Sequence, residues 1–321
     1  MKRKLTRILK IGIPLFLGVF LVWYSLGNSS PEERQRLWES IVEAKTFWIA
    51  VSFILGTLSH LSRAHRWKYM LEPMGYQSSL PNRFMAVMAA YLANFGIPRS
   101  GEVLRAVTMS TYEEVPFEKG FGTIISERVA DLLILMLIIG GVILLQTDEL
   151  LLYLDQQNIN PFYTFLFAIG IVACILLGIS IVRRSSWLPF RKIREIAKGL
   201  LEGMKSILRM EQKWAFIFHT ILIWTLYVLM FYVIKLSLPE TSDTAFNIIM
   251  AGFVVGSFAV SATNGGIGVY PLAVGGILIF FGVEKNGAEA FGWISWATQT
   301  AVVLLFGGLS FILLPLLNNK K

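Results

Sequence analysis

Long apolar runs alternate with short polar stretches along the whole of this chain. Each run is about as long as the roughly 20 residues that a helix needs to cross a bilayer. The runs lie near residues 8–27, 47–62, 120–146, 162–182, 213–236 and 290–315. Apolar residues are continuous within them and do not alternate with polar ones, which excludes a transmembrane β-barrel. The pattern therefore predicts about six full transmembrane helices.

Two further apolar stretches are interrupted by residues that break helices. Asn, Gly and Pro divide the stretches at about 83–97 and 245–283. Irregular backbone is tolerated at membrane depth only where protein buries it or where it lines a cavity. These stretches predict two broken or re-entrant helical elements. Whether 245–283 forms a hairpin or crosses twice stays open, because 245–262 alone is just long enough to span.

The composition supports the same class of protein. Hydrophobic residues make up 55% of the 321 residues, charged residues make up only 16%, and the mean hydropathy is +0.61. A soluble surface of this size needs more polar residues than that. We therefore expect an all-α integral membrane protein, built as a single polytopic membrane domain over residues 1–321.

Basic residues predict the orientation in the membrane. Lys and Arg gather before the first span and in segment 183–213, which holds nine of them, whereas 147–161 has acidic residues and no Lys or Arg. Loops rich in Lys and Arg stay in the cytoplasm. Both termini are therefore expected to be cytoplasmic, in the plasma (inner) membrane of a bacterium. Under this topology the two broken elements enter the membrane from opposite faces.

Opposed broken elements suggest an inverted-topology repeat. Each contains the pattern Asn-x-Gly-Ile, at Asn94 to Ile97 and at Asn264 to Ile267. The repeat halves would cover about 47–146 and 213–315. A match of four residues also arises by chance in a Gly-rich membrane protein, so the topology is the stronger argument.

Two amphipathic segments are expected at the membrane surfaces. Ser30-Pro31-Glu32-Glu33 is a capping box with Pro at the first helical position, and the apolar residues after it predict a short interfacial helix outside. Segment 187–211 combines an apolar stripe with a basic face, which is typical of a helix on the anionic cytoplasmic leaflet or of an elbow between two spans. Much of the net charge of +8 has this origin, so no nucleic-acid partner is expected.

The motifs of common enzymes are missing from the chain. The sequence has no Walker A motif, no His-Glu-x-x-His pair, no Gly-x-Ser-x-Gly elbow and no Asp-x-Asp pair. The single cysteine, Cys174, lies within a span, and His60, His65 and His219 are widely spaced. We therefore expect no cofactor, no metal and no self-contained enzyme.

Charged residues beside the first break and in the third span are the candidates for function. They are Arg99, Glu102, Arg105, Glu127, Arg128 and Asp131. Arg binds phosphate oxygens bidentately and keeps its charge when partly desolvated. The functional interpretation places the three arginines around an anionic head group, while the carboxylates orient them, meet a cationic part of the substrate or carry a coupled proton. The alternative is a cluster of salt bridges at the membrane border.

The breaks themselves favour an anion site. The residues that break the helices are Gly96, Pro98, Gly265, Gly266 and Gly268. A helix that restarts near Ser100 would expose unpaired backbone N–H groups and the positive end of its dipole, which attract a phosphate. Asn94 and Ser100 therefore join the expected head-group contacts, and the second break would supply another such helix end. The alternative at each break is a plain loop between helices.

Four motifs together resemble a known family. They are Arg63-Ala64-His65-Arg66-Trp67, Asn94 to Glu102 with Arg105, Glu127-Arg128 with Asp131, and Gly265-Gly266-Ile267-Gly268. In combination they look like the lysylphosphatidylglycerol synthase transmembrane region, also called the flippase-like domain, over about residues 5 to 316. The resemblance implies an integral membrane protein of a family implicated in moving lipids between leaflets. In the multiple peptide resistance factors of that family, this domain flips aminoacylated phosphatidylglycerol made by a fused cytosolic synthase.

The resemblance also implies that the six charged candidates occupy the family's characteristic polar positions, and the chain departs from the family pattern at two places. No synthase domain follows residue 321, so lipid aminoacylation by this chain is not expected. The family's Gly-rich break is commonly followed by an acidic residue, whereas Tyr270-Pro271 stands near that place here. A role for a carboxylate at the second break is therefore not supported.

The sequence thus predicts a lipid flippase that moves a phosphate-bearing lipid, with an aminoacylated or glycosylated head group among the options, between membrane leaflets. The expected partners are membrane lipids, including anionic phospholipid, and a separate lipid-modifying synthase. One alternative is a membrane enzyme, or a subunit of one, that acts on a lipid head group or a lipid-linked sugar. Another is a scaffold for a separate synthase that transports nothing. The identity of the lipid and the oligomeric state stay open.

Overall fold

The computed structural model describes residues 30–97, 100–146 and 210–318, together with residues 16, 20, 23 and 27. Throughout this part of the chain the ordered elements are helices, with no strand. The predicted spans near 8–27 and 162–182 and the predicted elbow at 187–211 lie outside the described residues, apart from residue 210 and the four isolated positions. An all-α membrane protein is confirmed for the remainder.

Four long helices match four of the predicted spans. They are α3 (Thr46–Leu71), α6 (Phe117–Leu145), α10 (Lys213–Val233) and α14 (Lys285–Asn318). Each is long and apolar enough to cross a membrane, counting the short 3-10 turns η1 (Glu72–Met74) and η2 (Ile234–Ser237) that continue α3 and α10. Large apolar side chains remain exposed along these helices, as expected where lipid and not water surrounds a protein.

The chain divides into two compact units, which are described separately. One unit comprises Met1–Ile124 and Glu211–Lys321, and the other comprises Ile125–Met210. Helix α6 begins in the first unit and continues into the second. The two broken elements both belong to the first unit.

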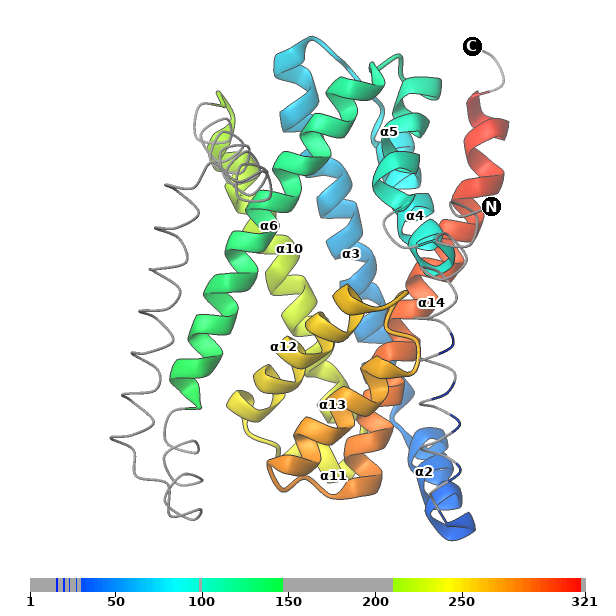
Figure 1. The fold of residues 1–321 in the computed structure, drawn as a ribbon, viewed down its shortest axis with the longest axis vertical. Helices are drawn as coiled ribbons and strands as arrows, with labels where there is room; N and C mark the ends of the chain where they lie inside the picture. The colour runs from blue at the N-terminus through cyan, green and yellow to red at the C-terminus, as the bar shows by residue number, and fades with distance from the viewer. Residues whose placement is uncertain are drawn as a thin grey trace, which may run out of the picture. The chain divides into compact units, whose positions relative to one another are not determined.

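Each broken element is a hairpin of two short helices. The first hairpin consists of α4 (Leu80–Gly96) and α5 (Ser100–Tyr112), and the second consists of α12 (Phe246–Ala262) and α13 (Val269–Phe280). At 1.5 Å per residue, the 12 residues of α13 extend about 18 Å, which is well short of the roughly 30 Å of a hydrocarbon core. Segment 245–283 therefore forms a hairpin of two apolar helices, of which α13 is too short to cross a membrane by itself. In Figure 1 the two hairpins lie toward opposite ends of the first unit, and their turns point to its middle.

The first break follows from a proline. Helix α4 starts at the N-cap Ser79, whose hydroxyl accepts a hydrogen bond from the backbone N–H of Asn82, and it ends after Gly96. Ile97 has an extended backbone with φ −127°. A residue that precedes proline is pushed out of the helical region by the proline ring, and Pro98 follows here.

The second break follows from glycine. Gly265, Gly266 and Gly268 have φ angles of +66°, +77° and +70°, which residues with a side chain rarely adopt. These left-handed positions reverse the chain between α12 and α13 without strain. Of the residues predicted to break the helices, Gly96 ends α4 and the three glycines lie in the second turn, whereas Pro98 lies outside the described residues.

The turns of the two hairpins contact each other. A Cβ atom added to Gly265 would lie 2.5 Å from the Phe95 ring at the end of α4, so the aromatic ring packs directly on the bare glycine backbone. The indole N–H of Trp296 in α14 donates to the carbonyl of Gly265 over 3.0 Å and holds the second turn in place. We call this meeting of Phe95 with Gly265 the tip contact.

Small residues bring the long helices together around the hairpins. A Cβ added to Gly307 of α14 would meet Met88 and Leu92 of α4, and one added to Gly56 of α3 would meet Met230 of α10. The hydroxyl of Ser52 donates to the Met230 carbonyl over 2.8 Å. Close approach through small residues is the usual way in which helices associate in lipid.

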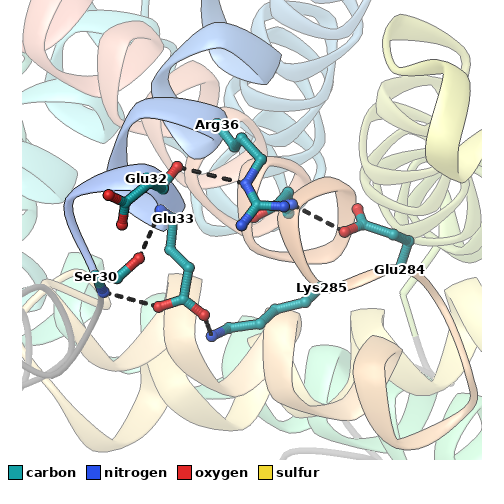
Figure 2. Close-up of polar contacts among 7 residues, drawn as sticks. Ser30, Glu32, Glu33, Arg36, Glu284 and Lys285 are labelled. Carbon is teal, nitrogen blue, oxygen red and sulfur yellow. Dashed lines mark hydrogen bonds and ion pairs between the residues drawn. The ribbon is translucent and has the colours of Figure 1, made fainter.

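A short amphipathic helix precedes α3, as predicted. Helix α2 (Pro31–Glu43) begins with the expected capping box between Ser30 and Glu33. The carboxylate of Glu33 also lies 2.7 Å from the ammonium group of Lys285 at the start of α14, as Figure 2 shows. A further short helix, α11 (Pro239–Ser242), lies in the loop between α10 and α12.

Candidate functional site

Asn94 and Ser100 tie the two helices of the first hairpin together. The side-chain oxygen of Asn94 accepts a hydrogen bond of 2.8 Å from the backbone N–H of Gly101. The hydroxyl of Ser100 reaches the carbonyls of Ile97, at 2.8 Å, and Ala93, at 3.2 Å. The backbone N–H of Ser100 also donates to the Ile97 carbonyl. The first two N–H groups of α5 are thus engaged within the protein, contrary to the expectation of free donors.

The second hairpin does not offer free donors at its first positions either. The N–H groups of Val269 and Tyr270 donate to the carbonyls of Ile267 and Gly266, at 2.8 and 2.9 Å, and Pro271 has no N–H. The positive end of the α13 dipole remains, but the expected backbone cradle for an anion is not formed there. Any anion at these turns therefore depends on side chains.

Of the candidate arginines, Arg105 is the one that is described and lies in the first unit. Its side chain is only 3% exposed, and its guanidinium carbon lies 3.8 Å from the centre of the Trp67 ring in α3. The indole N–H of Trp67 donates to the hydroxyl of Thr123 in α6 over 2.8 Å. Stacking of this kind stabilises a desolvated cation and fixes the plane of its fork. Glu102 lies one turn earlier on α5 and is half-buried.

Arg99 and Pro98 fall outside the described residues, and the charged residues of α6 belong to the other unit. Within α6, Glu127 is 1% exposed and Asp131 is also buried, as their spacing of four residues on one face predicts. Arg128, next along the helix from Glu127, is exposed. The head-group site that joins Arg128 to Arg99 and Arg105 stays a prediction.

Three further buried arginines were not among the sequence candidates. Arg63 and Arg66 lie in α3, and Arg83 lies in α4. The Arg66 guanidinium donates to Thr220 over 2.8 Å and lies 5.1 Å from the ring centre of Phe216. The Arg83 guanidinium donates to the carbonyls of Ala64 and Ser78 and to the Ser78 hydroxyl.

The sequence interpretation missed Arg63 and Arg66 because it ended the second span at residue 62. Helix α3 continues to Leu71, so Arg63 and Arg66 stand one turn apart within the helix and do not follow it. Trp67 beside them, fully buried, was the available signal. A buried guanidinium is costly unless partners surround it, and charged residues that are kept inside membrane proteins are commonly functional.

Two groups of aromatic and histidine side chains join α3 to its neighbours. The His60 ring lies 4.7 Å from the Tyr91 ring in α4 and 5.9 Å from the Tyr227 ring in α10. Further along α3, the His65 ring lies 4.9 Å from the ring of His219. The histidines are thus closer together than their sequence spacing suggested. Within the described ranges, no group of three or more His, Cys, Asp or Glu residues could hold a metal ion.

The fold and these buried charges define a class: an all-helical membrane protein with two hairpins of short helices whose turns meet. Comparison with known proteins then places the chain more closely. Residues 9–307 match the profile of the lysylphosphatidylglycerol synthase TM region, so the chain belongs to that family. The family resemblance seen in the sequence is therefore confirmed.

The chain is also similar to the UPF0104 membrane protein MJ1595 of Methanocaldococcus jannaschii. The two are 27% identical over 134 residues, which cover 41% of this chain and 38% of that relative. The matched region thus spans well under half of the relative's length. No solved structure matches the chain.

Proposed function

We propose that this protein is a lipid translocator, which moves a phosphate-bearing lipid head group from one membrane leaflet to the other. The observation that carries the proposal is the tip contact between Phe95 and Gly265. Paired re-entrant elements that meet near the middle of the membrane are typical of transporters that expose one site to each side in turn. Membership of a family with a flippase-like domain supports the same function.

Buried arginines provide the chemistry for a phosphate. Arg105 lies on α5, after the first break, and stacks on Trp67 of α3. Arg66 precedes Trp67 in the chain and packs against Phe216 of α10. Aromatic rings lie against both guanidinium groups and fix the planes of their forks, and a planar fork matches the geometry of phosphate oxygens. The acyl chains would remain in the bilayer while the head group passes along the hairpins.

The energy source follows from what the chain lacks. The sequence has no nucleotide-binding motif, so movement is either passive or coupled to an ion gradient. Glu102, Glu127 and Asp131 are the carboxylates that would carry a coupled proton. The basic loops support a topology with both termini in the cytoplasm, which would put the protein in a plasma membrane.

The test is transbilayer movement of lipid in liposomes that contain the purified chain. Fluorescent anionic and aminoacylated lipids are placed in one leaflet, and their appearance in the other is measured with and without an imposed proton gradient. Movement no faster than in empty vesicles under both conditions would contradict the proposal.

An Arg105→Gln variant makes the test specific. Because the substitution removes a charge-assisted contact to phosphate, the transport rate should fall at least about tenfold. Lys119→Gln, at an exposed position of α6, removes a charge of the same sign and should leave the rate unchanged. If transport and the amount of folded protein fell in parallel for Arg105→Gln, Arg105 would be structural and would not bind substrate.

A further inference from the structure

Several buried polar atoms have no hydrogen-bond partner within the protein. Among the described residues they include atoms of His60 of α3, Trp224 of α10, and Gln299 and Thr300 of α14, which lie near the middle of their helices, and of Asn264 in the second turn. We call these five residues the midplane cluster. Asn264 is the extreme case, since its side chain is 3% exposed and neither its oxygen nor its nitrogen is paired.

Such atoms are energetically unfavourable in a folded protein. A buried polar group without a partner costs about 1 to 3 kcal/mol, and lipid supplies no water to relieve it. Natural proteins keep few of them, and those that remain commonly serve a ligand. Leucine at position 264 would avoid this cost, so the amide calls for a functional explanation.

Contacts between aromatic rings link one part of the cluster through tyrosines. The His60 ring packs on the rings of Tyr91 and Tyr227, and the Trp224 ring lies 6.0 Å from the Tyr227 ring. The two tyrosine hydroxyls are 3.5 Å apart. The imidazole and the indole are therefore parts of one aromatic group between α3, α4 and α10.

The other part of the cluster surrounds the second turn. Asn264 precedes Gly265, which packs on Phe95, and Phe95 lies one turn after Tyr91 on α4. Trp296 donates to Gly265, and Gln299 and Thr300 lie one turn further along α14. The last turn of α4 thus connects the aromatic group with the tip contact.

The kinds of atoms in the midplane cluster select the ligand. The indole of Trp224 and the amide nitrogens of Gln299 and Asn264 only donate hydrogen bonds, whereas the Asn264 oxygen only accepts. The donors would repel a cation, and the Asn264 oxygen would repel an anion. A hydroxyl group both donates and accepts, and it carries no charge, so it satisfies all of these atoms.

We propose that the midplane cluster binds the hydroxyl groups of an uncharged, polyhydroxylated part of a lipid head group, such as a glycerol or a sugar. The inference rests on the proposed function, since the buried arginines bind the phosphate of the same lipid. The donors of the cluster do not favour a positive charge at this part of the head group. Selectivity then comes from hydrogen bonds that only a hydroxylated head group completes.

The test compares two lipids that differ only in hydroxyl groups. Phosphatidylglycerol and phosphatidylpropanol share their charge and the number of carbon atoms in the head group. Each is titrated into the full chain in nanodiscs of phosphatidylcholine, and binding is measured by thermal stabilisation and native mass spectrometry. The hydroxylated lipid should bind at least about tenfold more tightly. Equal binding of the two lipids would overturn the inference.

Substitution of Asn264 separates a binding role from a structural one. Asn264→Leu removes the unpaired amide, so the variant without lipid should be as stable as the natural protein or more stable, while the tenfold preference should disappear. If the variant kept the preference, the inference would be wrong. Should Asn264→Leu fail to fold, Trp224→Phe carries the same test, with Trp214→Phe, at an exposed position of α10, as its matched control.

Two further measurements distinguish a lipid ligand from a soluble one and binding from transport. Stabilisation by free glycerol 1-phosphate as strong as that by the lipid would overturn a lipid ligand in favour of a soluble one. Binding is measured without transport, so a preference for the hydroxylated lipid in a protein that moves no lipid would sustain this inference and refute translocation. Transport of both lipids at equal rates, with equal binding, would support translocation and refute this inference.

Discussion

Gly265 is the residue at which the second hairpin meets the first. Its φ of +66° suits glycine, and its missing side chain leaves room for the Phe95 ring. Two independent constraints therefore act on one position. Both would be violated by any residue that carries a Cβ atom.

Gly265→Ala should lower stability and slow transport. The positive φ alone costs about 1 to 3 kcal/mol for a residue with a side chain, and the new methyl group would displace Phe95 from the tip contact. Thermal unfolding in detergent and the liposome assay measure the two effects.

Gly276→Ala is the matched control for this substitution. Gly276 lies in α13 of the same hairpin, and a Cβ atom there would meet nothing within 4 Å. Alanine is the better helix former, so this variant should be at least as stable as the natural protein. Similar losses in both variants would mean that the tip contact has no special importance.

Single residues also mark the limit of what the sequence predicts. Asn94 and Ser100 were recognised as unusual polar residues at a break, but their hydrogen bonds to Gly101 and Ile97 depend on how the chain folds back. Asn264 looked like part of a turn, and only its burial reveals an unpaired amide. Residue type indicates which positions are special, whereas partners are set by three-dimensional packing.

An ion pair between Glu33 and Lys285, two residues far apart in the sequence, joins helix α2 to the start of α14. The Lys285 ammonium group donates to Glu33, and this contact together with the Ser30 backbone holds the pKa of the Glu33 carboxyl below its usual value of 4.5. Figure 2 shows the Arg36 side chain close by, directed toward Glu284. Charged side chains of α2 therefore face charged side chains at the start of α14.

The contribution of Glu33 to stability should depend on pH. A carboxyl whose pKa is lowered in the folded protein stabilises it above the unfolded pKa, and this contribution disappears as the pH falls through the lowered pKa. The melting temperature of Glu33→Gln should therefore lie slightly below that of the natural protein at pH 7, and the two should converge as the pH falls through the lowered pKa of Glu33. The effect is small because the pair is exposed.

Glu43→Gln is the control, since Glu43 lies at the opposite end of α2. Its difference from the natural protein should not show the same convergence. A constant difference between Glu33→Gln and the natural protein over the whole pH range would show that the ion pair contributes nothing measurable.

Hydrophobic runs predicted the long helices because lipid imposes length and continuity on them. The same criterion missed α5, where Glu102, Arg105 and Thr108 dilute the apolar residues. It also ended α3 too early, because Arg63 and Arg66 looked like a cytoplasmic flank. Hydropathy detects helices that contact lipid, and it does not detect helices or helix ends that other parts of the protein cover.

On the scale of the whole molecule, the order of helices repeats. A long helix, two short helices and a long helix occur as α3 to α6, and the same order occurs as α10, α12, α13 and α14, with the small helix α11 inserted. The repeat halves at 47–146 and 213–315 stay a prediction, with which this order of helices is consistent. Opposite entry of the hairpins is the feature that an inverted repeat requires.

Cysteine labelling should find the bases of the two hairpins on opposite sides of the membrane. Glu118 follows the first hairpin and Asp243 precedes the second, and both side chains are exposed. In a Cys174→Ser background, an impermeant maleimide should label position 118 from the cytoplasm and position 243 from outside. Labelling of both from one side would contradict the inverted arrangement.

The tip contact has a mechanical consequence. An aromatic ring resting on a glycine backbone is attracted by dispersion alone, and each pair of atoms contributes only about 0.1 to 0.2 kcal/mol. Hydrogen bonds of Asn94 and Trp296, by contrast, hold the first and the second turn. We therefore expect the contact between the two turns to open and reclose more readily than either turn unfolds.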